Sequence, residues 1–325
     1  MTSDTLILIH TIFRHGERTT DLEFMYPNDP HREEEFLPYG PGYLTNEGKN
    51  QMYDLGKKLR NRYNQYLGDL YLPKYVDARA SRFPRAQISL QLVLASLFQP
   101  TGRTIWNEDL NWQPIAYKED KILAAAFSEE FLKVYYEYFE NEGKQMLNDH
   151  EDMLRYLRKH AGNDFKTTRD IWALHATLTT EVVSGLKLPD WTSTVFPQYT
   201  LKLALQEYYV QTTTKQLRKL VVGQLMQKIL IDTKAKINGT SNCKIHLYSC
   251  HDNNIANALI FFGLLAPNYF PKYAACIVVE IHKINKKYVI KLLYSPSNTD
   301  NFEYLTFSNG VDTLDLDEFD SMVKD

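Results

Sequence analysis

Arginine, histidine and aspartate side chains gather at three points of the chain where a strand is expected to end. The first is the segment Arg14-His15-Gly16-Glu17-Arg18, the second is Arg79, and the third is His251-Asp252. Ligands of open α/β sheets bind outside the carboxyl ends of the strands, so we expect these side chains to meet at one sheet edge. Three converging guanidinium groups repel one another unless they bind an anion, and a phosphate dianion fits their planar forks.

Each residue type has a chemical reason to be in such a site. Neighbouring arginines disfavour the imidazolium form of His15, so its ring stays neutral and can attack phosphorus as a nucleophile. Gly16 allows the backbone to approach a ligand closely. Asp252, at the start of a predicted helix, is placed to protonate the leaving alkoxide as a general acid. That role requires a protonated carboxyl group, so we expect activity to favour acidic pH.

Taken one at a time, these motifs have ordinary structural interpretations. Arg-His-Gly is also typical of a solvated strand end, and His251-Asp252 of a helix N-cap beside a histidine. Arg79, Arg82 and Arg85 are compatible with the solvated first turn of a helix. The segment 42–49 has the wrong spacing for a phosphate-binding P-loop. The shared position at three strand ends is what favours a functional site.

Hydrophobic patterns indicate the elements that would position these residues. The predicted strands cover residues 6–13, 75–78, 244–250, 276–282 and 288–293. One helix is expected after the N-cap candidate Thr45, because Met52, Leu55, Leu59 and Tyr63 follow at helical spacing. A second, buried helix is expected over residues 86–98. The order strand, loop, helix, strand, helix suggests parallel crossover units.

The middle of the chain differs from both ends. It is charged, rich in Tyr and Leu and poor in strand patterns, with amphipathic stretches at residues 129–141, 146–160, 200–209 and 213–233. We therefore predict an α/β fold with a mainly parallel central sheet flanked by helices. Residues 1–110 and 239–325 would form this core, and residues 111–238 would form a mostly helical cap.

Composition excludes several classes of protein. The 325 residues include 37 Lys and Arg against 40 Asp and Glu, a net charge of −3, so we expect no nucleic-acid partner. The longest apolar runs fall short of the roughly 18 residues that span a bilayer, and no leader is recognisable. The chain is therefore expected to be either cytosolic or a mature secreted form with an added Met. Three cysteines, Cys243, Cys250 and Cys276, allow at most one internal disulfide, and Asn238-Gly239-Thr240 is a single glycosylation sequon.

Several motifs together resemble the histidine acid phosphatases. Residues 14–19 (RHGERT) are similar to the family's R-H-G-x-R signature, and residues 248–252 (YSCHD) to its strand that ends in His-Asp. Residues 42–48 (GYLTNEG) resemble the family's helix start, and residues 78–81 (ARAS) a strand end that brings in a further arginine. The resemblance covers about residues 5 to 300 and is strongest to the prostatic, lysosomal and insect venom or salivary enzymes.

The resemblance implies hydrolysis of small-molecule phosphate monoesters in two steps, without a metal or another cofactor. By this resemblance His15 becomes phosphohistidine, and Asp252 protonates the leaving oxygen. The implied phosphate-binding residues are Arg14, Arg18, Arg79 and His251. The resemblance also implies a secreted or lysosomal protein, which favours the mature-chain interpretation, and a homodimer stays open.

The sequence departs from the family pattern beside the expected catalytic residues. Thr20 replaces a usual proline, and Arg82 and Pro84 stand where acidic residues are common, whereas Arg85 matches. Asn253-Asn254 replaces the commoner Thr-Thr, and Cys250 replaces a small residue. Two other functions therefore stay open: a binding protein for phosphorylated or other anionic ligands that has lost turnover, and a cytosolic mutase or transferase of the same superfamily.

Overall fold

The computed structural model describes residues 4–266, 268–307 and 309–324. Its centre is one mixed sheet of eight strands. These are β1 (Leu6–Arg14), β2 (Val76–Ala80), β3 (Lys118–Glu119), β4 (Ile245–Cys250), β5 (Cys276–Ile284), β6 (Lys287–Ser295), β7 (Glu303–Tyr304) and β8 (Leu314–Asp315). The strand order is β3-β2-β4-β1-β5-β6-β7, with β8 paired to β6.

The parallel strands bring three sequence segments to one sheet edge. β1, β4, β2 and β3 run parallel, with Arg14 opposite Cys250 and Ala80 opposite Ser249. β5 and β6, which include the strands predicted at residues 276–282 and 288–293, continue the sheet antiparallel. The prediction of an α/β fold with a mainly parallel central core is therefore confirmed, and β1, β2 and β4 all end at the same side.

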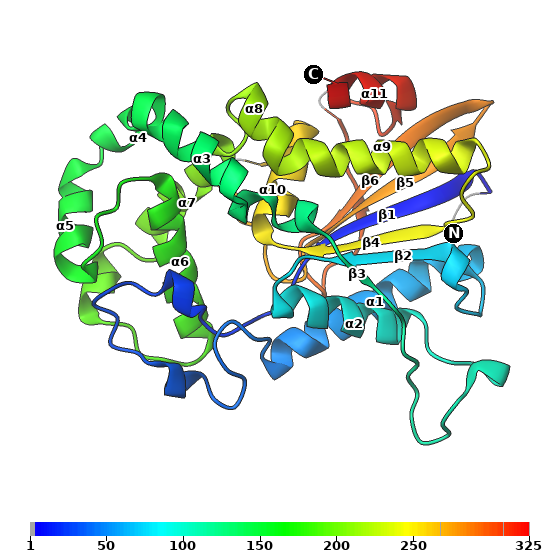
Figure 1. The fold of residues 1–325 in the computed structure, drawn as a ribbon, viewed down its shortest axis with the longest axis horizontal. Coiled ribbons are helices and arrows are strands. Elements are labelled where there is room, and N and C mark those ends of the chain that lie inside the picture. Colours follow the sequence, from blue (N-terminus) through cyan, green and yellow to red (C-terminus); the bar gives the residue numbers. More distant parts are fainter. Residues whose placement is uncertain (1–3, 267, 308, 325) are drawn as a thin grey trace.

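Helices cover both faces of this sheet (Figure 1). The α-helices are α1 (Asn46–Leu67), α2 (Pro84–Leu97), α3 (Glu129–Tyr138), α4 (Gln145–Asn148), α5 (Glu151–Ala161), α6 (Thr168–Val183), α7 (Gln198–Val210), α8 (Lys215–Arg218), α9 (Gln224–Ile237), α10 (Asp252–Phe261) and α11 (Leu316–Lys324). Helices α1 and α2 lie on one face, and α9 and α11 lie on the other. Among the described residues, no helix is long and apolar enough to cross a bilayer.

The alternating direction of the side chains along β1 explains why helices cover both faces of the sheet. Ile9 and Phe13 pack with α1 and α2, whereas Leu8 and Ile12 face the opposite way, because successive strand residues point to opposite sides. All of these side chains are fully buried. A strand buried on both faces reads as a continuous apolar run, which is how residues 6–13 appear in the sequence.

Helices α3 to α7 form a separate group beyond the carboxyl ends of the parallel strands (Figure 1). They come from the range 111–238 that was expected to form the cap. Two elements of that range lie with the sheet instead: β3 pairs with β2, and α9 packs across β1. Helix α6 was not predicted, although it contributes to the site described below.

Candidate active site

The backbone at the end of β1 is fixed by both neighbouring strands. The N–H of His15 donates to the Cys250 carbonyl of β4 at 3.0 Å, and the His15 carbonyl accepts from the N–H of Ala274, just before β5, at 3.2 Å. The side chain of His15 is 2% exposed. The residue predicted to be the nucleophile therefore sits on rigid backbone at the sheet edge.

Hydrogen bonding sets the tautomer of His15. Its Nδ1 atom lies 2.8 Å from the Gly16 carbonyl oxygen, which can only accept, so Nδ1 carries the hydrogen and Nε2 keeps its lone pair. Burial, followed by the positive charges of Arg85 and Arg14, lowers the pKa of His15 well below its ordinary value. His15 therefore stays neutral in acid, with Nε2 unprotonated.

Three buried arginines lie around this ring: Arg14, Arg18 and Arg85 are 8%, 5% and 3% exposed. Each guanidinium donates to one protein oxygen, in the pairs Arg14–Pro271, Arg18–Thr19 and Arg85–Asp21. The buried Nε–H of each one meets no acceptor among the described residues. Burial and the charge of Arg18 also lower the pKa of Arg85 to about 9. The cluster thus carries excess positive charge and spare donors, which suit an oxyanion.

His251 lies against His15 from the neighbouring strand end. The two rings are 5.4 Å apart in an edge-to-face arrangement, and His251 is the N-cap of α10. Its Nε2 is 2.8 Å from the hydroxyl of Ser81, which the sequence analysis did not select. Burial and the charges of Arg85 and Arg18 lower the pKa of His251 well below its ordinary value. Ser81 was detectable only as the residue that directly follows β2.

Asp252 connects the sheet edge to the cap. It is 5% exposed, and its Oδ2 accepts from the Tyr208 hydroxyl at 2.7 Å and from the Trp172 indole N–H at 3.2 Å. Tyr208 belongs to α7 and Trp172 to α6. Neither was selected from the sequence. Tyr208 lies in the amphipathic stretch 200–209, where an aromatic residue usually indicates core packing, and Trp172 lies in a helix that was not predicted.

The loop between His15 and α1 is held by two glycines in close contact. A Cβ atom on Gly16 would lie 2.2 Å from the Gly48 carbonyl oxygen, and one on Gly48 would lie 2.0 Å from the Glu17 carbonyl oxygen. Thr45 caps α1 by accepting from the Gly48 N–H, as predicted, and donates to the Glu17 carboxylate at 2.8 Å. Gly16 is therefore required by helix packing, whereas the sequence analysis explained it by ligand approach.

Arg79 does not join this cluster. Successive strand residues face opposite ways, so on β2 Arg79 shares a face with Asp77, and its Nε lies 2.7 Å from that carboxylate. Its Nη1 lies 2.7 Å from Asp120. Arg85, from the first turn of α2, supplies the third guanidinium beside His15. The structure therefore places Arg85, and not the predicted Arg79, in the cluster beside His15.

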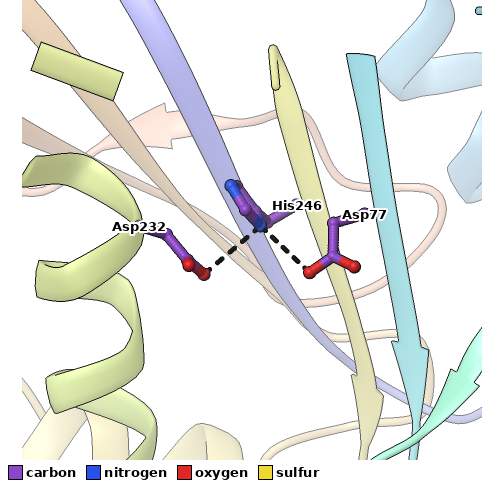
Figure 2. A group of neighbouring side chains, drawn as sticks. All are labelled: Asp77, Asp232 and His246. Atoms are coloured by element: carbon purple, nitrogen blue, oxygen red, sulfur yellow. Dashed lines mark ion pairs between the residues drawn. The ribbon is translucent and has the colours of Figure 1, made fainter. Parts of the chain in front are cut away.

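Asp77 belongs to a network on the α9 side of the sheet. Figure 2 shows His246 Nδ1 between two carboxylates, 3.4 Å from both Asp77 and Asp232. All three side chains offer a ligand atom within 4.8 Å of the others. However, Lys228 lies 2.8 Å from Asp232 and Arg79 lies against Asp77, so these cations would repel a divalent metal. We interpret the group as an ion-pair network.

This network predicts a pH-dependent stability. Burial opposes protonation of His246, but interactions with Asp77 and Cys243 and then the charge of Asp232 outweigh it and raise the pKa of His246 to about 9. Its stabilisation is therefore complete below about pH 6.5 and is lost as the pH rises towards 9. We expect the free energy of unfolding to fall by up to about 3 kcal/mol across this interval.

Denaturant unfolding at several pH values between 6 and 10 would measure this change, and His246→Gln should remove most of it. His10→Gln is the matched control, because His10 stacks on His246 at 4.6 Å but burial lowers its pKa. A wild-type slope that survives in His246→Gln would contradict this assignment.

A cavity of about 530 Å³ opens beside Arg14 and Arg18. Its walls are mostly apolar and include Phe196, Leu201 and Phe270, and the exposed Lys272 lies among its lining residues. His175 of α6 also faces it, and burial lowers the pKa of this ring to about 4. The cavity therefore combines a cationic end with an apolar wall.

The departures from the family pattern have structural counterparts. Thr20 shares a hydrogen bond of 2.8 Å with Thr180, which ties the loop to α6. Asn254 accepts from the His251 N–H at 3.1 Å and so completes the start of α10. Arg82 and Pro84 are exposed, and Cys243, Cys250 and Cys276 are all buried free thiols.

Comparisons with known proteins agree with this geometry. Residues 5–295 match the family described as the histidine phosphatase superfamily (branch 2). The chain is 36% identical to the venom acid phosphatase of Apis mellifera, over 88% of this chain and 76% of that one. It is 31% identical to the prostatic acid phosphatase of Homo sapiens, over 89% and 77%, and 28% identical to the human lysosomal acid phosphatase, over 86% and 68%.

Solved structures share the fold at lower identity. The Hafnia alvei phytase in complex with tartrate matches with a TM-score of 0.70 and 17% identity, over 98% of this chain and 96% of that one. The phytase from Citrobacter braakii matches with a TM-score of 0.68 and 14% identity, over 98% and 97%. At these identities the likeness concerns the fold alone.

Proposed function

The chain belongs to branch 2 of the histidine phosphatase superfamily, and from this premise we propose that it hydrolyses phosphate monoesters at acidic pH through a phosphohistidine at His15. Its relatives carry the name acid phosphatase, so the enzyme class follows from the family. The observation that supports the mechanism is the tautomer of His15. Its unprotonated Nε2 lies in a cluster with three spare guanidinium donors.

The proposed reaction has two displacements at phosphorus. In the first, Nε2 of His15 forms a bond to phosphorus while the ester P–O bond breaks, and the proton of Asp252 passes to the leaving oxygen. In the second, water attacks phosphorus, the N–P bond breaks, and Asp252 accepts a proton from the water. We propose that Arg14, Arg18, Arg85 and His251 hold the phosphoryl oxygens, because charge stabilisation dominates phosphoryl transfer.

We propose that the preferred substrates carry an apolar or aromatic leaving group. The wall of the 530 Å³ cavity is mostly apolar, and burial there stabilises a ring or an alkyl chain. A leaving group with several further phosphates would need more cations than Lys272, which is the lining residue that adds positive charge to Arg14 and Arg18.

Labelling the phosphoenzyme tests the proposed function. An acidic reaction with a ³²P-labelled aryl monoester, quenched within the first turnover, should leave label on the protein. The label should map to the peptide that contains His15 and should be stable in alkali but lost in acid, as expected for a phosphoramidate. Label that transfers to an added alcohol in place of water would favour the transferase alternative.

A secreted or lysosomal location is the second part of this proposal. It is supported by the venom and lysosomal origin of two relatives. The sequon Asn238-Gly239-Thr240 is exposed at the end of α9, where a glycan could be attached without disturbing the core.

A homodimer is the third part. The loop between α2 and β3 extends away from the body of the molecule (Figure 1), and it exposes four large apolar side chains: Ile105, Trp106, Leu110 and Trp112. The Trp106 indole donates to the Trp112 carbonyl at 2.6 Å, so the exposed ring is held in place. A two-fold axis would let the same patch cover itself on a second copy.

We expect the protein to sediment as a dimer at micromolar concentration and Trp106→Glu to sediment as a monomer, because a buried unpaired carboxylate is costly. Ile231→Glu is the matched control, since Ile231 is 54% exposed, close to the 55% of Trp106, but lies on α9. Monomeric wild-type protein at tens of micromolar would contradict the proposed dimer.

A further inference from the structure

We propose that Tyr208 is a positioning residue for the general acid: it holds Asp252 in one orientation and confines the acidic proton to Oδ1. This inference rests on the proposed role of Asp252. It concerns the cap helix α7, which supplies the hydroxyl group that lies 2.7 Å from Oδ2.

Oδ2 of Asp252 has both of its lone pairs in use. A carboxyl oxygen has two in-plane lone pairs. At Oδ2 of Asp252, one is taken by the Tyr208 hydroxyl and the other by the Trp172 indole N–H. An indole N–H can only donate, so the Trp172 contact cannot reverse. The neutral acid must therefore carry its hydrogen on Oδ1.

The Tyr208 hydroxyl acts as a hydrogen-bond donor. It is 0% exposed, and burial together with the charge of Asp252 raises the pKa of its hydroxyl well above the ordinary value. The hydroxyl is therefore neutral, and it donates its hydrogen to Oδ2 of Asp252. Within the described part of the chain, Oδ1 of Asp252 accepts no protein hydrogen bond, so it is available to the leaving oxygen.

Hydrogen bonds hold helix α7 in place around Tyr208. Next to Tyr208, the buried Glu207 accepts from Tyr135 of α3 at 2.6 Å and from Thr168 of α6 at 2.7 Å. Through Gln211 it is also linked to Asn257 of α10, by two hydrogen bonds of 2.9 Å. The helix that carries Tyr208 is therefore tied to α3, α6 and α10, the last of which carries Asp252 itself.

Several other titratable groups interact electrostatically with Asp252. They are Arg85 of α2, His175 of α6, Cys250 of β4 and Tyr208 itself, with the adjacent His251 on the same element. Burial keeps His175 neutral above about pH 4 and raises the pKa of Cys250. A change that removes only the Tyr208 hydroxyl leaves all of these groups in place, so its effect reports on that hydrogen bond.

The test compares Tyr208→Phe with the wild type on two esters. Without the hydroxyl group, Oδ2 of Asp252 keeps only the Trp172 contact, so the variant should hold the acidic proton in a less fixed orientation. We expect kcat/KM for an alkyl phosphate to fall about tenfold. The value for p-nitrophenyl phosphate should change less than about threefold, because p-nitrophenolate leaves without a proton.

Tyr63→Phe is the matched control. Tyr63 is also fully buried, and its hydroxyl also donates to a carboxylate, Glu280, at 2.7 Å. That pair lies between α1 and the middle of β5, so its loss should leave kcat/KM for both esters unchanged. Equal losses on both esters, or no loss at all, would overturn the positioning role of Tyr208.

Asp252→Asn separates this inference from the proposed function. If Asp252 is the general acid, this variant should lose far more activity on the alkyl ester than on p-nitrophenyl phosphate. An Asp252→Asn variant without such selectivity would overturn the acid assignment and, with it, the inference about Tyr208. Selectivity in Asp252→Asn that is absent in Tyr208→Phe would overturn only the latter.

Discussion

Replacement of His15 by alanine is expected to lower kcat/KM for phosphate monoesters by about four orders of magnitude or more, as removal of a covalent nucleophile does elsewhere. The reason is that Nε2 of His15 is the unprotonated ring atom in the arginine cluster. Water would have to replace it in direct attack, and no phosphoenzyme should form. Steady-state assays at acidic pH and the absence of ³²P label on the protein would measure both effects.

The arginine cluster should survive this substitution. Arg14, Arg18 and Arg85 keep their contacts with protein oxygens, so the variant should still bind inorganic phosphate in calorimetry. His10→Gln is a suitable control, because His10 is a buried histidine of the same strand but faces Thr233 on the α9 side. Wild-type turnover by His15→Ala would refute the phosphohistidine mechanism, whereas phosphate binding without turnover in the wild type would select the binding-protein alternative.

The elements that carry the site residues were predictable where burial follows a simple period. Residues 6–13 are a mostly apolar run and residues 244–250 have a strand pattern, and both became strands buried on both faces. Met52, Leu55, Leu59 and Tyr63 repeat at helical spacing, and all four are fully buried on α1. The carboxyl ends of parallel strands lie at one edge of the sheet, so the sequence alone could predict that these ends meet. The structure does place His15 beside His251.

Helix α6 could not be found in the same way. It is buried on several sides, with polar residues such as Thr177, Thr180 and Glu181 among its buried positions, so its sequence has no clear apolar stripe. It is also rich in β-branched residues, which lower helix propensity. Trp172 and the pocket wall therefore depend on tertiary packing between α6 and α7 that no local pattern encodes.

A different physical cause explains why Arg85, and not the predicted Arg79, lies beside His15. A strand end was expected to deliver its last arginine to the sheet edge, but the two-residue period of β2 turns Arg79 towards Asp77 on the α9 side. Arg85 reaches the site because α2 begins at Pro84, directly beyond the strand. The sequence contained both arginines, but their directions depended on where the strand stopped and the helix began.

Substitution of Arg85 should therefore lower activity, whereas substitution of Arg79 should lower stability. Arg85→Ala is expected to lower kcat/KM by a factor of about 10² to 10³, the usual cost of removing one donor that stabilises transition-state charge. Arg79→Ala should leave kcat/KM within about threefold of the wild type. Instead it should lower the free energy of unfolding by about 2 kcal/mol, because Asp77 and Asp120 each lose a cation at 2.7 Å.

Both variants should be assayed with an aryl and an alkyl monoester and unfolded with denaturant at the same acidic pH. Arg85→Ala should bind inorganic phosphate more weakly than the wild type, since one of the three buried guanidinium groups is lost. Arg79→Ala should bind it unchanged. If Arg79→Ala instead lost activity while its fold and stability were intact, the phosphate site would have to include Arg79, and the network drawn in Figure 2 would be part of the active site.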